Sequence, residues 1–275
     1  MKIDLHAHTR HSDGMFTPTA LIEEAATRGV AVQAVTDHDS VAALAEAREA
    51  GKRLGVQVVT GVEFSTRDAV GDVHVLAFFP SDPPASFLAL LEKQQAQRQW
   101  RAARILERLA ELNMPVTWED LRAAGADERS VGRPHVARAL LARGFVSSFP
   151  EAFKRWLAPG RPAYVKHDVP QPEEAVRAVL EAGGVPVVAH PGHLKDPTTL
   201  DRMIAAGLKG VETFHPDHRP DQVAQFASLA LKRDLIPTGG SDFHGLTGQR
   251  FAKLGDYPTP PEAFARIEAL WGNPE

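Results

Sequence analysis

Short apolar runs recur along this chain of 275 residues, and most of them are followed at once by histidine, aspartate or glutamate. Segments with helical periodicity separate most of these runs. Alternating strands and helices predict an α/β fold with mainly parallel strands and right-handed crossovers. The expected strands are a run that begins at residue 2 and residues 30–35, 56–62, 72–79, 184–189, 210–214 and 235–238.

The polar residues after these runs favour a closed barrel over an open sheet. The carboxyl ends of parallel strands form the active face of an α/β barrel. An open doubly wound sheet would collect its ligand contacts at one switch point instead. Nearly every expected strand carries a polar residue at its tip. Because there is one strand fewer than in the common eightfold barrel, we expect a distorted seven-stranded (β/α)7 barrel.

The middle of the chain has a different pattern. Helical periodicity covers residues 98–112, 117–124, 132–142 and 150–157, with no strong strand between them. We therefore expect a helical insertion, residues 103–170, that caps the mouth of the barrel. The barrel itself would consist of residues 1–102 and 171–275.

His6 and His8 are separated by one residue at the end of the first expected strand. Positions i and i+2 of an extended segment point the same way, so both imidazoles can face one metal ion. With the polar residues of the other strands, the candidate ligands are His6, His8, Asp13, His38, Glu63, His74, His190, Asp242 and His244. This set exceeds what one ion accepts and predicts about two or three ions.

The composition limits the metal, the substrate and the location. The chain has no cysteine, which leaves imidazole and carboxylate ligands suited to Mn²⁺, Fe²⁺, Zn²⁺ or Mg²⁺, with Mn²⁺ as the first candidate. The net charge of -4 excludes a generally basic surface that coats nucleic acid. Bound divalent ions would make the mouth of the barrel locally positive, which selects phosphate esters. No apolar run approaches the length of a membrane span, so we expect a cytoplasmic protein.

Widely separated motifs resemble those of the polymerase and histidinol phosphatase (PHP) superfamily. They are His6-x-His8 with Asp13, Thr36-Asp37-His38-Asp39, Gly61-Val62-Glu63, Ala189-His190-Pro191-Gly192 and Gly240-Ser241-Asp242-Phe243-His244-Gly245. The resemblance implies a distorted seven-stranded barrel with a trinuclear metal centre. It also implies His6, His8, Glu63 and Asp242 at a first metal, Glu63 shared with His74 and His190 at a second, and Asp13, His38 and His244 at a third.

A narrower resemblance concerns residues 131–138, 160–165 and 212–218. These segments are similar to the PHP branch of bacterial 3',5'-nucleoside bisphosphate phosphatases, some of which act as 5'-to-3' exoribonucleases on short RNA. The resemblance implies a small nucleotide substrate, with short single-stranded RNA as a further possible substrate. Arg133 and His135 lie near the start of an expected helix, where backbone N–H groups and a guanidinium both favour phosphate oxygens. They are the candidates for binding a second phosphate.

The expected reaction is hydrolysis of a phosphomonoester by a metal-bound hydroxide, which needs no side-chain nucleophile. His193 and His218 are both candidates for the general acid, and His218 is also a candidate for substrate binding. Two alternatives stay open at this point. One is a histidinol-phosphate phosphatase, and the other is a PHP module without catalytic activity. Arg133 and His135 favour a substrate with a second phosphate over histidinol phosphate. The complete ligand set argues against a non-catalytic module, because such a module would not need to keep costly polar groups at the mouth of the barrel.

Overall fold

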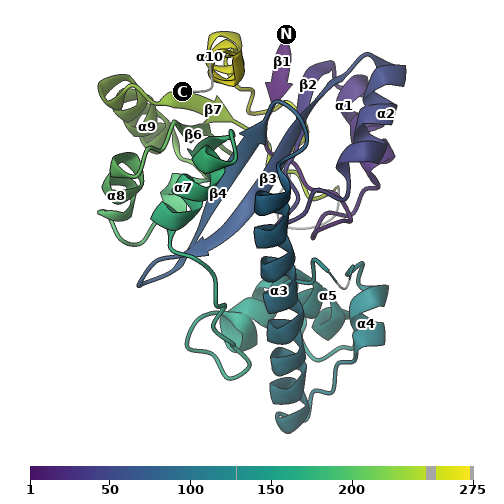
Figure 1. Ribbon diagram of the computed structural model, residues 1–275. Coiled ribbons are helices and arrows are strands. Elements are labelled where there is room, and N and C mark those ends of the chain that lie inside the picture. Colours follow the sequence, from purple (N-terminus) through teal and green to yellow (C-terminus); the bar gives the residue numbers. More distant parts are fainter. Residues whose placement is uncertain (128, 246–251, 273–275) are drawn as a thin grey trace.

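The computed structural model describes residues 1–127, 129–245 and 252–272 of the chain (Figure 1). Within these residues a seven-stranded sheet has its strands side by side in chain order. The strands are β1 (Lys2–Asp4), β2 (Val30–Val35), β3 (Gln57–Arg67), β4 (Asp72–Phe79), β5 (Val185–Val188), β6 (Gly210–Phe214) and β7 (Ile236–Gly239). The predicted seven-stranded α/β barrel is therefore confirmed.

Strand β4 is the exception to the parallel arrangement. It pairs antiparallel with both β3 and β5, whereas the other neighbouring strands are parallel. Only residues 68–71 join β3 to β4, which is too short for the helical crossover that a parallel pair requires. The amino end of β4 consequently lies beside the carboxyl ends of the other strands. This reversal brings His74 to the predicted active face.

The first and last strands approach each other and nearly close the barrel. The backbone N–H of Leu5 donates to the carbonyl of Gly239 at 3.2 Å, and Ala7 pairs with Phe243 in a parallel bridge. The interior is filled by apolar side chains from many strands, including Ile3, Leu76, Phe78, Val187 and Ile236. Burial of these side chains is the main force that holds the barrel together.

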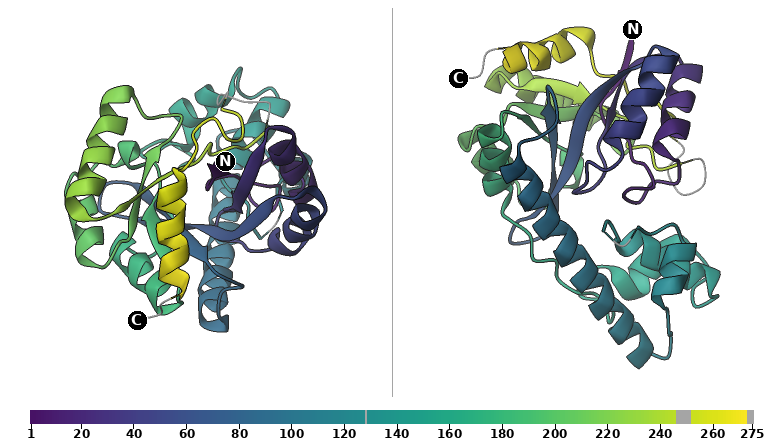
Figure 2. Two further views of the ribbon diagram at one scale, coloured as in Figure 1. Left: turned by 90° about the horizontal axis from the view of Figure 1, so that it is seen from above. Right: turned by 45° about the vertical axis from the view of Figure 1, so that its right-hand side comes forward.

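Helices α1 (Pro18–Thr27) and α2 (Leu44–Leu54) lie on one side of the barrel (Figure 1). The opposite side carries α7 (Pro172–Glu181), α8 (Thr199–Ala205) and α9 (Pro220–Arg233). Helix α1 begins with a proline after a threonine cap, and the Thr17 side chain accepts the backbone N–H of Ala20. Helix α10 (Pro261–Gly272) crosses the end of the barrel where the N-terminus lies (Figure 2).

A long helix, α3 (Ala85–Glu111), extends from the barrel and continues through the expected boundary at residues 102 and 103. Beside its outer half lie α4 (Trp118–Ala123) and α5 (Arg133–Ala142), followed by α6 (Phe149–Ala152) and the single π-helical turn η1 (Phe153–Leu157) (Figure 2). These helices share a separate apolar core that includes Ile105, Leu109, Leu121, Leu140 and Leu157. Among the described residues, no helix is long and apolar enough to cross a membrane.

Candidate metal centre and adjoining cavity

Glu63 is the buried carboxylate around which several imidazoles gather. Its Oε1 atom lies 2.7 Å from His74 Nδ1 and 2.9 Å from His190 Nε2. Its Oε2 atom lies 3.1 Å from His38 Nδ1 and 3.2 Å from His8 Nε2. Strand β3 continues to Arg67, so Glu63 lies within a strand and not at its tip. A carboxylate with two oxygens facing different imidazoles can bridge two metal ions.

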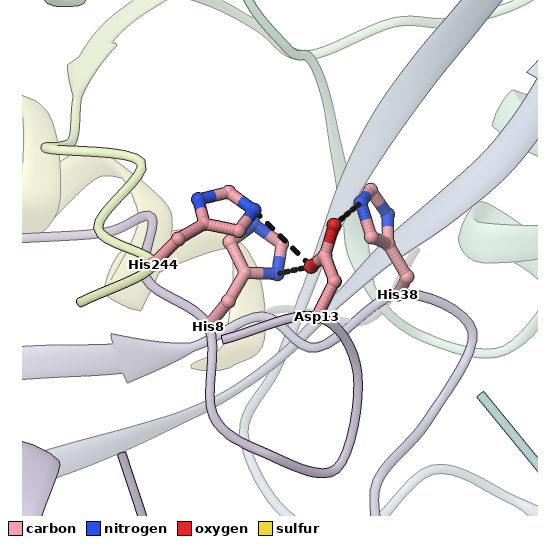
Figure 3. A group of neighbouring side chains, drawn as sticks. All are labelled: His8, Asp13, His38 and His244. Atoms are coloured by element: carbon pink, nitrogen blue, oxygen red, sulfur yellow. Dashed lines mark ion pairs between the residues drawn. The ribbon is translucent and has the colours of Figure 1, made fainter. Parts of the chain in front are cut away.

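Asp13 is the centre of a second group, shown in Figure 3. Its Oδ1 atom lies 3.1 Å from His244 Nε2 and 3.8 Å from His8 Nδ1, and its Oδ2 atom lies 3.8 Å from His38 Nε2. The rings of His8 and His244 stack with centroids 4.2 Å apart. These four side chains come from three separate loops, and their ligand atoms are close enough to hold one ion.

His6 and His8 face one point, as their spacing predicts. Their Nε2 atoms are 3.2 Å apart, and Asp242 Oδ1 lies 3.4 Å from the first and 3.1 Å from the second. His6 Nδ1 donates to Glu212 Oε1 at 2.8 Å, so in the neutral ring Nε2 presents a lone pair. Ligand atoms about 2.1 Å from a tetrahedral ion lie about 3.4 Å from one another. The Nε2 atoms of His6 and His8 and the Oδ1 atom of Asp242 are thus spaced as the ligand atoms of one metal ion would be.

The charges of this centre are strongly coupled. Burial disfavours the charged form of His6, but Glu212 and Glu63 outweigh it and raise the pKa of His6 to about 10. Burial disfavours the charged form of Glu212, but His6 and His215 outweigh it and lower its pKa to about 2. Burial also lowers the pKa of His190 to about 3. In the metal-free protein a proton on His6 thus provides positive charge that a metal ion would otherwise supply.

All nine candidate ligands lie within one connected set of contacts. Possible metal-binding groups are His6–His8–Glu63, His38–Glu63–His74, His8–Asp13–His38–His244 and His6–Glu212–His215. His8 takes part in two of them, because its two ring nitrogens face different carboxylates. The family resemblance associated His8 with only the first metal, so its contact with Asp13 is an additional observation.

Glu212 and His215 complete the buried centre but were not among the candidate ligands. Besides accepting from His6, Glu212 accepts the backbone N–H of His190 at 2.6 Å. His215 Nε2 lies 3.3 Å from Asp242 Oδ2. The sequence contains one signal for Glu212, since it is a charged residue within the otherwise apolar and β-branched strand β6. Such a buried partner orients a ligand and fixes its tautomer.

The backbone around the centre is tightly constrained. His190 and Asp242 have φ values of 30° and 47°, a region that residues other than glycine rarely adopt. A Cβ atom added to Gly240 would lie 2.3 Å from the Cβ of His6. Only glycine therefore allows the segment directly after β7 to approach His6 this closely.

The loop between His8 and Asp13 is held by Asp37. Its Oδ1 atom accepts the backbone N–H of Thr9 at 2.7 Å and the Ser12 hydroxyl at 2.6 Å, and its Oδ2 atom accepts the Thr9 hydroxyl at 2.6 Å. The Ser12 hydroxyl also lies 3.3 Å from His8 Nδ1. Asp37 therefore positions the loop that carries Asp13.

A cavity of about 150 Å³ adjoins the centre. Its lining includes Asp13, His38 and His74 from the candidate ligands and Arg98, Arg101, Arg133 and His167 from the helical region and the segment after it. Arg133 Nη2 donates to Asp72 at 2.8 Å. Arg98 Nε donates to Asp39 at 2.6 Å. Candidate metal ligands and guanidinium groups thus line the same cavity.

The other predicted residues occupy different environments. His135 is fully buried, and its Nδ1 accepts the backbone N–H of Gly132 at 3.1 Å. His218 is also buried. Its Nδ1 atom donates to the Thr213 carbonyl, and its Nε2 atom accepts the backbone N–H of Gly192. His193 is half-exposed and lies 3.2 Å from Asp217. His193 thus has solvent access, whereas a direct substrate contact by His135 would require its ring to be uncovered first.

The fold and the site define an α/β barrel with a buried centre suited to several metal ions. Residues 4–115 match the PHP domain family. A solved structure of a candidate metal-dependent phosphoesterase from Bifidobacterium adolescentis superposes with a TM-score of 0.88 at 35% identity, covering 97% of this chain and 95% of that one.

The curated proteins that match over nearly their full lengths include the following three. A phosphoribosyl 1,2-cyclic phosphate 1,2-diphosphodiesterase from Eggerthella lenta is 37% identical, over 90% of this chain and 95% of its own. A 3',5'-nucleoside bisphosphate phosphatase from Chromobacterium violaceum is 36% identical, over 93% and 92%. The 5'-3' exoribonuclease Rnm from Escherichia coli is 33% identical, over 99% and 94%. The chain therefore belongs to the PHP family, and its buried clusters are those of a metal-dependent phosphoesterase of this family.

Proposed function

We propose that this protein is a metal-dependent phosphatase that removes the 3'-phosphate of nucleoside 3',5'-bisphosphates. The products would be inorganic phosphate and a nucleoside 5'-monophosphate. The observation that carries the proposal is the lining of the cavity, where Arg133 shares one space with Asp13, His38 and His74. A substrate with two phosphates can place one at the metal ligands and the other at a guanidinium, so that remote binding energy positions the reacting group.

We propose the nine candidate residues as the ligands of two or three divalent ions, with Mn²⁺ as the first candidate. Bound ions would supply positive charge to the phosphoryl oxygens and lower the pKa of a water molecule. The residues of this chain have separate tasks. Glu63 holds imidazoles on both of its oxygens. Glu212 keeps the Nε2 lone pair of His6 directed at the centre.

We further propose that residues 103–170 form a cap over the barrel mouth. Two arginines of α5 support this role, because both reach the barrel. Arg138 Nη2 donates to the Asp13 carbonyl at 2.5 Å, and Arg133 Nη2 donates to Asp72 at the start of β4. The cap would limit the access of water and of longer substrates to the metal ligands.

Of the two candidate general acids, the contacts favour His193. Both ring nitrogens of His218 already have hydrogen-bond partners. The half-exposed ring of His193 can exchange protons with solvent, and its centroid lies 5.1 Å from that of His190. A leaving-group oxygen bound near His190 would therefore lie close to His193, which could donate a proton to it.

A second candidate function is 5'-to-3' exoribonuclease activity on short RNA. A larger cavity of about 650 Å³ favours it, because Gly14, the residue directly after Asp13, is part of its lining. Arg10, Arg122 and Arg138 line it, together with a single described carboxylate, that of Asp127. Such a cavity suits the further phosphates of an oligonucleotide.

A substrate panel with and without Mn²⁺ tests these functions. It contains adenosine 3',5'-bisphosphate, a 5'-phosphorylated RNA trinucleotide, phosphoribosyl 1,2-cyclic phosphate, histidinol phosphate and p-nitrophenyl phosphate. We expect Mn²⁺-dependent turnover, with the highest kcat/KM on the bisphosphate and adenosine 5'-monophosphate as product. A higher kcat/KM on the trinucleotide would make the exoribonuclease the main activity. No Mn²⁺-dependent hydrolysis of any of these substrates would contradict both functions.

A further inference from the structure

Arg101 is a buried arginine without a carboxylate partner. It lies just past the middle of α3, and only 8% of its surface is exposed. Its Nε donates to the Val165 carbonyl at 2.9 Å, but its buried Nη2 atom has no hydrogen-bond partner among the described residues. A buried charge of this kind is costly unless an anion compensates it.

The carboxylates near Arg101 are already engaged by other arginines. Asp72 accepts from Arg67 at 2.6 Å and from Arg133 at 2.8 Å. Asp39 accepts from Arg98 at 2.6 Å. Within the described part of the chain, no carboxylate lies within ion-pair distance of Arg101. Asp72 attracts Arg101 from beyond ion-pair distance, so the buried Nη2 atom makes no direct contact with an anion among the described residues.

His167 is a second unsatisfied group in the same cavity. It is 5% exposed, and its buried Nε2 atom has no partner among the described residues. The chain on either side of it is held in place, because Arg101 binds the Val165 carbonyl and the backbone N–H of Arg67 donates to the Pro170 carbonyl at 3.0 Å. The ring is therefore held beside the cavity.

The protonation states suit a phosphate ligand. Burial lowers the pKa of Arg101 to about 9, with Arg133 adding to the effect, so its guanidinium is charged at neutral pH. Burial lowers the pKa of His167 to about 2, and Arg98 and Arg101 act in the same direction. The neutral imidazole can still donate one hydrogen bond.

We propose that Arg101 and His167 together bind the phosphate of the substrate that is not hydrolysed. Both groups line the cavity that also contains Asp13, His38 and His74. The ligand class is a phosphate ester, whose oxygens would accept from Nη2 and from the imidazole. The imidazole of this second site is thus His167, and not the buried His135. This inference rests on the proposed bisphosphatase function.

The test compares adenosine 3',5'-bisphosphate with adenosine 3'-monophosphate, which lacks the second phosphate, using the Mn²⁺-loaded protein. For Arg101→Met we expect kcat/KM on the bisphosphate to fall by about 10- to 100-fold, while kcat/KM on the monophosphate stays nearly constant. Arg104→Met is the matched control, since Arg104 lies on the same helix with an exposed side chain paired to Glu107. It should leave both values unchanged.

Conservative variants separate binding from a structural role. Arg101→Lys keeps the charge and His167→Gln keeps an N–H donor, so each should retain more selectivity for the bisphosphate than Arg101→Met and His167→Ala do. Equal losses on both substrates would overturn the inference and assign the pair to folding. A wild-type protein that hydrolyses both substrates equally well would also overturn it.

The inference can fail separately from the proposed function. If the wild type releases no phosphate, the proposed function is wrong, and the increase in Tm caused by adenosine 3',5'-bisphosphate still tests the binding site. The inference then requires a larger increase in the wild type than in Arg101→Met. Equal increases in the two proteins would contradict it.

Discussion

The Nδ1 atom of His6 lies 2.8 Å from Oε1 of Glu212, and neither side chain has accessible surface. Glu212 also accepts the backbone N–H of His190. A single carboxylate on β6 thus orients a ligand from the first strand and another from the loop after β5. Glu212 therefore holds two candidate ligands in position through direct contacts.

Glu212→Gln should weaken metal binding without removing any of the nine candidate ligands. The amide cannot stabilise the imidazole as a carboxylate does, so we expect the affinity for Mn²⁺ to fall by about 10- to 100-fold. Equilibrium dialysis with elemental analysis measures this change. Glu107→Gln, on the exposed face of α3, is the control. An unchanged Mn²⁺ affinity in Glu212→Gln would show that the contact does not support the centre.

Asp13→Ala should remove one metal site selectively. Asp13 is the carboxylate of the group that contains His8, His38 and His244, whereas Glu63 belongs to two of the other three groups. We expect the wild type to hold two to three equivalents of divalent metal, and the variant to hold one equivalent fewer. Elemental analysis after Mn²⁺ loading checks both values. At most one tightly held ion in the wild type would contradict the multi-metal centre.

The metal-free protein should lose stability as the pH rises above neutrality. The pKa of His6 is raised from 6.5 to about 10 by Glu212 and Glu63. The resulting stabilisation is fully present below pH 6.5 and is lost as the pH rises through about 10. Urea unfolding after metal removal should show a midpoint that falls across this interval. The fall should be smaller in Glu212→Gln, and a midpoint that rises with pH would contradict the prediction.

Gly240→Ala should displace His6. The added Cβ would lie 2.3 Å from the Cβ of His6 and 2.6 Å from its backbone nitrogen. We expect the free energy of unfolding to fall by about 1–3 kcal/mol, together with a loss of activity. Gly272→Ala is the control, because nothing lies within 4 Å of the added Cβ at the end of α10. Unfolding and kinetic measurements on both variants test this. Full activity in Gly240→Ala would be the contrary result.

Arg133→Ala should reduce selectivity for a second phosphate. A charge-assisted contact contributes about 1.5–3 kcal/mol, or about one to two decades in kcat/KM. We expect this loss on adenosine 3',5'-bisphosphate and little change on p-nitrophenyl phosphate. Arg143→Ala, which removes an exposed guanidinium paired with Asp120, serves as the control. Equal losses on both substrates would place Arg133 in the hydrolytic centre or in folding.

Local rules determined much of this protein. The side chains of His6 and His8 point the same way because strand residues alternate with period two, and this holds wherever the strand lies. Thr17 and Pro18 begin α1 for an equally local reason. Apolar strand segments are buried in the core whichever strands they pair with. The barrel, and the polar residues at the ends of its strands, could therefore be predicted from the sequence.

Only the tertiary structure decided which distant groups meet. The reversal of β4 follows from a short connection and brings His74 to Glu63. Neither Arg101 nor His167 belongs to a motif, because their common feature is a cavity formed by segments far apart in the chain. His135 lies near the start of α5 but faces the interior. Burial and long-range pairing depend on the packing of all the elements together, and no local pattern encodes them.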